Sequence, residues 1–155
     1  DKGETDGIFE KQTVIDSSGL VGQVIEVSKQ YSRVMLITDL NSFVPVALLR
    51  NNLRLMLQGM GMSEKLQLLH VNPTADIRVG DLLISSGLGE RFPAGYPVGL
   101  INAIDYVEGR PFVDVTAIPK SGLDRSQHLL LVFSENSVSV AENGQAPLEV
   151  SRFAD

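Results

Sequence analysis

The stretch VIDSSGLVGQVIEV, residues 14–27, joins two apolar segments through a Ser-Ser-Gly turn. Its pattern returns later in the chain, because SSGL occurs at residues 17–20 and again at residues 85–88. After an insertion in the second copy, the Val-Gly pair at residues 21–22 also matches the pair at residues 98–99. The repeat predicts two similar modules, each of which begins with a strand, a glycine turn and a second strand.

The other apolar segments are short, and many alternate apolar with polar residues, which is typical of β-strands. In residues 53–60, for example, Leu53, Leu55 and Leu57 would share one face of a strand. No long segment has helical periodicity, so we expect an all-β fold. Because a closed sheet has no exposed edges, the expected architecture is two small β-barrels in tandem.

Glycine and proline positions refine this expectation. Four glycines are expected to be structural and to lie at turns: Gly19, Gly22, Gly87 and Gly99. Gly19 and Gly87 would supply the backbone freedom that the repeated turn requires. Pro45 cannot donate to a ladder, so the strand in residues 42–50 is expected at a sheet edge or at a bulge.

A polar connector, NPTADIRVGD at residues 72–81, is the expected domain boundary. Residues 1–75 would form the first barrel together with an N-terminal lead-in, and residues 76–133 would form the second. Residues 134–155 contain few large apolar residues, and their composition predicts a flexible acidic tail. Whether a terminal strand of one half completes the other barrel stays open.

The composition excludes several classes of function. The chain has 155 residues, a net charge of −6 and no cysteine. No basic face is present for nucleic acid, and an acidic surface disfavours direct binding to anionic lipid. Without cysteine there is no disulfide and no thiolate metal site. The carboxylates are scattered singly, so no metal or cofactor is expected, and no apolar stretch reaches the length of a membrane span.

A serine hydrolase is the main alternative, since the turn of residues 16–19 resembles a serine-protease signature. Ser17 or Ser85 would then be the nucleophile and would need a base within hydrogen-bond reach. The only histidines are His70 and His128. Each flanks an apolar segment, where a structural or solvated histidine is expected, so no catalytic residue is assigned.

Candidate protein contacts lie in two stretches. If the leucines of residues 53–57 face the core, Met56 points outward beside Arg54, and Met60 and Met62 follow. Exposed methionine suits protein contacts, although a second buried face would explain the same pattern. Phe92 and Tyr96 would either cap a barrel or anchor a partner. A third hypothesis is a module that binds a small ligand or glycan at a barrel mouth.

Two long motifs resemble the MreC family of bacterial rod-shape-determining proteins. They are GLVGQVIEVSKQYSRVMLITD at residues 19–39 and GDLLISSGLGERFPAGYPVG at residues 80–99. The KG…DG pattern of residues 2–7 and the ADIRVGD segment also fit, so the resemblance runs from Lys2 to about Phe133. One departure is Glu90, where glycine is common in the family.

The resemblance implies a non-enzymatic scaffold of the cell-elongation machinery. Such proteins have an N-terminal helix in the inner membrane and then a coiled coil, so this chain, which opens on Asp1, would be the periplasmic part. The resemblance also implies two small barrels arranged somewhat like those of chymotrypsin-type proteases, without their catalytic residues. It further implies antiparallel self-association, possible filaments, and binding to a class B penicillin-binding transpeptidase and to MreD.

Overall fold

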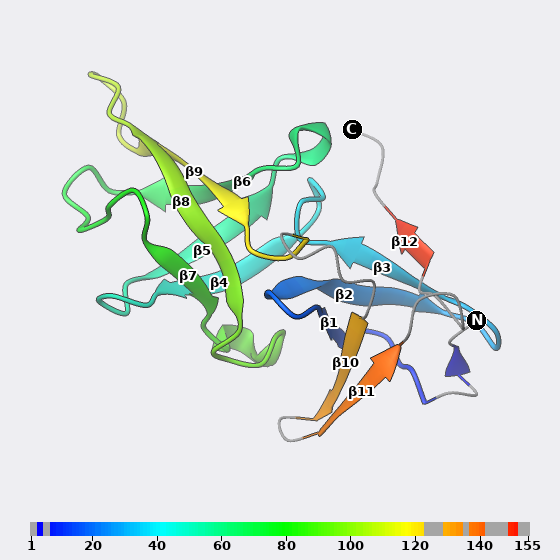
Figure 1. Cartoon of the computed structure of the whole chain (residues 1–155). Coiled ribbons are helices and arrows are strands. Elements are labelled where there is room, and N and C mark those ends of the chain that lie inside the picture. Colours follow the sequence, from blue (N-terminus) through cyan, green and yellow to red (C-terminus); the bar gives the residue numbers. More distant parts are fainter. Residues whose placement is uncertain (1–2, 5–6, 123–128, 135–136, 142–148, 152–155) are drawn as a thin grey trace.

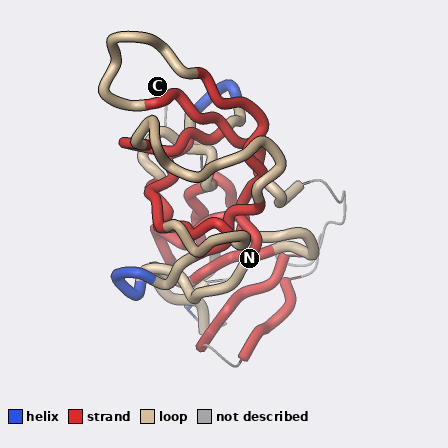
Figure 2. The backbone as a smooth tube through the Cα atoms, turned by 90° about the vertical axis from the view of Figure 1, so that its left-hand side faces the viewer, coloured by secondary structure: helices blue, strands red, loops and turns tan. Residues whose placement is uncertain are grey.

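The computed structural model describes residues 3–4, 7–122, 129–134, 137–141 and 149–151. The fold is all-β, as the alternating segments predict, and consists of a closed barrel beside an open sheet (Figure 1). The strands are β1 Thr13–Ile15, β2 Leu20–Val27, β3 Ser32–Leu36, β4 Phe43–Leu48, β5 Arg54–Gly59, β6 Leu66–Val71, β7 Leu82–Ser85, β8 Pro97–Asp105, β9 Val113–Pro119, β10 Leu129–Ser134, β11 Ser137–Ala141 and β12 Glu149–Ser151. The short 3-10 turns η2 Gly61–Ser63 and η3 Leu88–Glu90 lie in loops, where Figure 2 shows them in blue.

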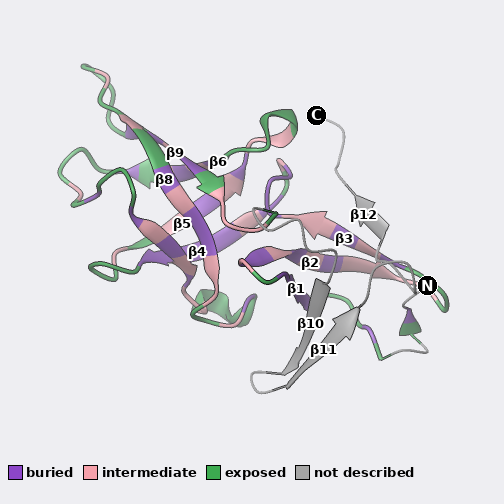
Figure 3. Ribbon diagram, in the orientation of Figure 1, coloured by how far each residue is buried: buried purple, intermediate pink, exposed green. Residues whose placement is uncertain are grey.

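The barrel has the strand order β4-β5-β6-β9-β8-β7, and every neighbouring pair is antiparallel. Burial changes along most of its strands, as Figure 3 shows by the change from purple to pink or green, whereas β4 is buried from Val44 to Leu48. Val44, Val46 and Leu48 of β4 are buried in the interior, where Leu57 of β5 and Leu83 of β7 join them. Period-two alternation therefore fills this barrel with branched aliphatic side chains.

The open sheet has the order β11-β10-β1-β2-β3-β12. A small core of Ile8, Val14, Val24 and Val34 lies against it. All its neighbours are antiparallel except β12, which runs parallel to β3.

Barrel and sheet share a hydrophobic core at their junction. Ile15, Leu20 and Ile37 come from the sheet side and pack with the buried residues of the barrel. Gly19 also approaches the barrel closely, since a Cβ atom there would lie 2.5 Å from the carbonyl oxygen of Pro97. The two parts are therefore packed directly on one another rather than connected by a loose linker.

The grouping of strands differs from the expected tandem barrels. Strands β4–β6 and β7–β9 lie on opposite sides of the connector 72–81, yet they close one barrel together. Strand β10 then returns to pair with β1. Within the described residues, the part built around β1–β3 is an open sheet and not a second closed barrel. Local alternation locates strands, but it does not determine which distant strands pair.

Two further expectations also differ from the structure. The strand of Pro45 is not at an edge, because β4 pairs with β5 on one side and with β7 on the other, and neither ladder has a register shift that would mark a bulge at Pro45. Pro45 lies just before Val46, the first residue that β4 pairs with β7, and its carbonyl accepts the Ser86 N–H at 3.0 Å. Residues 134–155, expected as a tail, contain β11 and β12. In the described part of the chain, no helix is both long and apolar enough to span a membrane.

Candidate functional site

The protease-like turn of residues 16–19 is organised by the Asp16 carboxylate, which is only 8% exposed. One oxygen accepts the N–H groups of Ser18 at 2.8 Å and Gly19 at 3.0 Å. The other accepts the N–H of Gly122, just beyond β9, at 2.8 Å. Asp16 therefore connects the β1–β2 turn to the point where the chain leaves the barrel.

The matching serine of the second motif, Ser85, is also structural. It is 1% exposed, its hydroxyl donates to the carbonyl of Pro93 at 2.6 Å, and it accepts the N–H of Tyr96 at 2.9 Å. Gly87 has φ +75°, and a Cβ atom there would lie 3.0 Å from that of Ala94. Ser85 and Gly87 thus fold the loop before β8 back onto the barrel.

These contacts disfavour the hydrolase hypothesis. The Ser85 proton is directed to a carbonyl oxygen and not to a base. His70 lies on β6, where its ring meets Phe112 edge to face at 5.1 Å. His128 falls outside the described residues. Among the residues that the structure describes, no group of three or more His, Cys, Asp or Glu side chains could hold a metal.

Of the glycines expected at turns, Gly87 has the positive φ that a turn requires. Gly19 follows the turn but does not have a positive φ. Glycine is required there because the carbonyl oxygen of Pro97 leaves no room for a Cβ atom. Gly22 and Gly99 lie inside β2 and β8, so they are strand positions rather than turns. A Cβ atom at Gly99 would lie 2.8 Å from the carbonyl oxygen of Ile118, so close strand packing explains this glycine.

Burial varies along the methionine stretch. Leu57 is buried in the core, whereas Arg54 is exposed and Met56 is half-buried on the outer side of β5. Met56 lies opposite Leu69 of β6. Met62, in η2, is 86% exposed.

The aromatic candidates of the loop lie inward instead. Phe92 is 6% exposed and belongs to the barrel core, and Tyr96 is half-buried against that core. Of the two roles considered for these side chains, this burial fits capping of the barrel and does not fit the exposed partner anchor for which they were candidates. The hydrogen bonds of Ser85 bend the loop back and account for this burial.

Exposed aromatic residues occur instead around the β8–β9 hairpin. Phe112 and Tyr106 are 45% and 60% exposed. A cavity of about 490 Å³ beside Phe112 is lined by Met60, Leu69 and His70, among others. The sequence contained a signal for this site, because two aromatic residues flank a glycine turn in YVEGRPF, residues 106–112. We call Met56, Met60, Leu69, His70 and Phe112 the outer barrel face.

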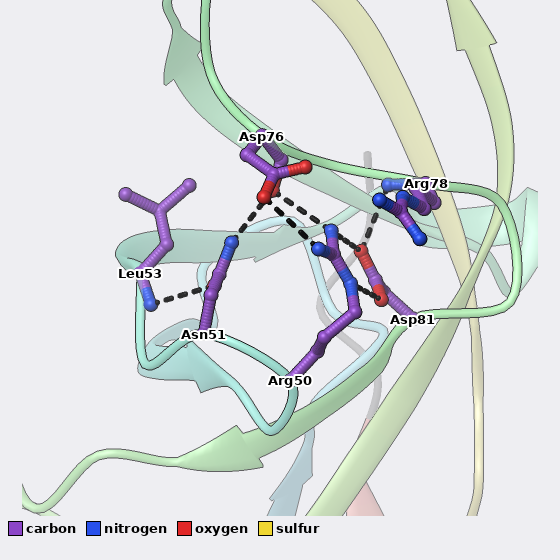
Figure 4. Close-up of polar contacts among 6 residues, drawn as sticks. All are labelled: Arg50, Asn51, Leu53, Asp76, Arg78 and Asp81. Atoms are coloured by element: carbon purple, nitrogen blue, oxygen red, sulfur yellow. Dashed lines mark hydrogen bonds and ion pairs between the residues drawn. The ribbon is translucent and has the colours of Figure 1, made fainter.

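An ion-pair cluster fixes the end of the barrel next to the connector (Figure 4). The Arg50 guanidinium donates to both carboxylate oxygens of Asp81, at 2.9 and 3.0 Å, and to the Asp76 carboxylate at 3.0 Å. Asn51 and Arg50 also donate to the Asp76 carbonyl, at 2.8 and 3.0 Å. This cluster, the Arg50 clamp, holds the β4–β5 turn against the segment that precedes β7.

Electrostatics in the Arg50 clamp favour the charged forms of all three side chains. The hydrogen bond from Arg50 lowers the pKa of Asp81 despite its burial, and it lowers the pKa of Asp76 as well. The hydrogen bond with Asp81, followed by that with Asp76, raises the pKa of Arg50 above its ordinary value. The sequence does not reveal this cluster, because its members lie far apart along the chain and meet only in the fold.

Comparison with known proteins identifies the family. The family model described as "Rod shape-determining protein MreC, barrel core" matches residues 1–133. The cell shape-determining protein MreC of Escherichia coli (strain K12) is 42% identical over 155 residues, which is 100% of this chain and 42% of that protein. The chain belongs to the MreC family. It spans less than half the length of the curated MreC relatives that it matches.

Solved MreC structures have the same fold. The crystal structure of MreC from Pseudomonas aeruginosa superposes with a TM-score of 0.81 and 51% identity, over 86% of each chain. MreC in a complex with penicillin-binding protein PBP2 from Helicobacter pylori superposes with a TM-score of 0.58, over 77% of this chain and 74% of that chain. At 20% identity, this second likeness concerns the fold alone.

The structure shows the backbone at Glu90, the position at which the resemblance noted above would lead us to expect glycine. Glu90 has a left-handed φ of +57°. Glycine adopts that conformation without steric cost, whereas a residue with a Cβ atom is strained there.

Proposed function

We propose that this chain is a non-enzymatic scaffold module that acts in determining cell shape by binding proteins of the wall-synthesis machinery. Membership in the MreC family carries the proposal. The choice of partners is motivated by two similar structures: MreC in a complex with PBP2, and the major periplasmic domain from the cell shape-determining filament MreC. The partners proposed are a class B penicillin-binding transpeptidase, further copies of the chain, and MreD.

The outer barrel face is the surface that we assign to protein contact. Met56 and Leu69 are cross-strand neighbours, and Phe112 adds an exposed aromatic ring. Methionine adapts to different partner shapes, and aromatic side chains dominate many interface cores. Arg110 and Asp114 pair at 2.8 Å beside Phe112 and would supply a polar rim.

Met56→Glu tests this assignment in a binding experiment. The purified extracytoplasmic domain of a class B penicillin-binding transpeptidase from the same bacterium is immobilised, and the chain is titrated over it. A carboxylate in the centre of an apolar contact has to be desolvated without a partner, so affinity should fall at least tenfold, or about 1.4 kcal/mol. Leu88→Glu is the matched control, since Leu88 is 54% exposed on the separate turn η3.

The same pair of variants tests self-association in analytical ultracentrifugation. Met56→Glu should lower the average mass across a concentration series, whereas Leu88→Glu should not. If Met56→Glu leaves both transpeptidase binding and sedimentation unchanged while the variant stays folded, the outer barrel face is not an interface. The proposed location of the chain is extracytoplasmic, in a protein anchored in the inner membrane.

A further inference from the structure

One edge of the open sheet is covered by the last described strand of the chain. Strand β12 pairs in parallel with β3, and the register places Glu149 beside Arg33, Val150 beside Val34 and Ser151 beside Met35. On its other side β3 pairs with β2. Without β12, the five-residue strand β3 would therefore be the edge of the sheet.

A sheet edge with unpaired N–H and C=O groups is a template for another strand, and short edge strands are one way in which proteins block it. Strand β12 replaces a five-residue edge with a three-residue edge. Parallel pairing is slightly less stable per residue than antiparallel pairing, and three pairs form only a short ladder. The cover is thus the kind of contact that opens locally at small cost.

The covering strand lies beyond the match to the family model, which ends at residue 133. The chain beyond that point contributes strands to both edges of the sheet, because β11 pairs with β10 at one edge and β12 pairs with β3 at the other. The barrel and strands β1–β3 are complete without β12.

The exposed edge of β3 would fit a second copy of the same strand. In an antiparallel pair centred on Val34, Arg33 of one copy lies opposite Met35 of the other, so the two arginines do not face each other. The side chains of Ser32 and Val34 are fully buried in each sheet, so such a pair would also continue the buried layer across both copies. A two-fold contact of this kind is closed and self-complementary.

We infer that β12 is an intramolecular block on sheet-to-sheet pairing: while it occupies β3, a second copy of the chain is kept from adding its own β3 there. Release of β12 exposes the edge and permits an antiparallel dimer through β3. This dimer uses the open sheet and is separate from association through the outer barrel face.

The test removes β12 in two ways, in a Met56→Glu background that silences the proposed barrel contact. One variant ends at Ala141. The other keeps the full chain but carries Val150→Pro and Ser151→Pro, each of which removes a backbone N–H donor. Because neighbouring N–H groups in a strand point in opposite directions, one of the two removed donors faces β3. Val150→Ala with Ser151→Ala is the matched control, which keeps both donors.

Sedimentation across a concentration series and hydrogen exchange at the amides of Arg33–Met35 are measured together. Both β12 variants should approach twice the mass of one chain with these amides protected, whereas the control stays monomeric. The peptide ENGQAPLEVSRFAD, residues 142–155, added in excess to the truncated chain, should restore the monomer.

A folded variant that stays monomeric, or that dimerises while the β3 amides exchange rapidly, overturns the inference. If Met56→Glu does not alter association of the full chain, the barrel contact is refuted. The test of pairing through β3 still holds in that case, because hydrogen exchange measures protection of the β3 amides directly. If truncation prevents folding, the double-proline variant decides.

Discussion

Replacing Asp16 with alanine tests whether the protease-like turn is structural, because this one carboxylate accepts three backbone hydrogen bonds. Asp16→Ala removes the carboxylate oxygens that accept the N–H groups of Ser18, Gly19 and Gly122 at 2.8–3.0 Å. A hydrogen bond to a charged group contributes about 1.5–3 kcal/mol. Gly19 is buried, so its bond counts in full, whereas water can reach the more exposed N–H groups of the other two. The expected loss in the free energy of unfolding is about 3–5 kcal/mol.

Asp16→Asn separates the turn from its connection to the barrel. The amide has the same shape but only one acceptor oxygen, and its NH2 group cannot accept a hydrogen bond. The variant therefore loses either the two bonds within the turn or the single bond from Gly122. Its free energy of unfolding should fall by about 1–3 kcal/mol, so its stability should lie between that of the wild type and that of Asp16→Ala.

Urea unfolding followed by circular dichroism near neutral pH measures all three free energies. Hydrogen exchange at the Gly19 and Gly122 amides then shows which bonds the asparagine keeps. If Asp16→Ala costs less than about 1 kcal/mol, the carboxylate does not organise the junction, and the structural account of the turn is refuted.

Three further outcomes follow from the contacts described. The pKa values of Asp76 and Asp81 are lowered in the fold. The stability that the Arg50 clamp contributes is therefore complete above the ordinary carboxyl pKa of about 3.9, and it is lost as pH falls through the pKa values of the folded state. Asp81→Asn should flatten this acid dependence of the melting temperature in thermal melts. Gly59→Ala places a Cβ atom against the Thr38 and Asp39 backbone, and overpacking of about 1–3 kcal/mol should lower the melting temperature by several degrees in calorimetry. Phe92→Ala should cost about 3–5 kcal/mol in urea unfolding, and Leu88→Ala close to nothing; equal losses would contradict the burial of the loop.

Strand positions and faces could be predicted from the sequence because they depend on local periodicity. Leu57 and Met56 were expected on opposite faces of one strand, and they are. The pairing of strands could not be predicted in the same way, since β6 pairs with β9 and β1 with β10 across long separations in the chain. Nothing local to either strand encodes such a partner, so the expected division near residue 75 cuts through strands that share one barrel.

The side-chain direction of the candidate contact residues was predictable where a strand sets it, and not where a loop does. Met56 faces outward because its neighbours in the strand face the core. Phe92 lies among glycines and prolines that are typical of an exposed loop, yet it is buried because Ser85 draws Pro93 and Tyr96 back against β7. A buried serine that accepts and donates within its own loop has no signature in the sequence.

The repeated SSGL motif is the clearest case of similar residues that meet different constraints. In the first copy Ser17 is exposed, and Gly19 is required because the Pro97 carbonyl approaches it. In the second copy Ser85 is buried, and Gly87 is required by its positive φ. The two copies nevertheless meet, since the loop that Ser85 closes ends at Pro97, the residue on which Gly19 packs. What the repeat encodes is thus one contact between sheet and barrel, built from two unequal turns, rather than two equivalent modules.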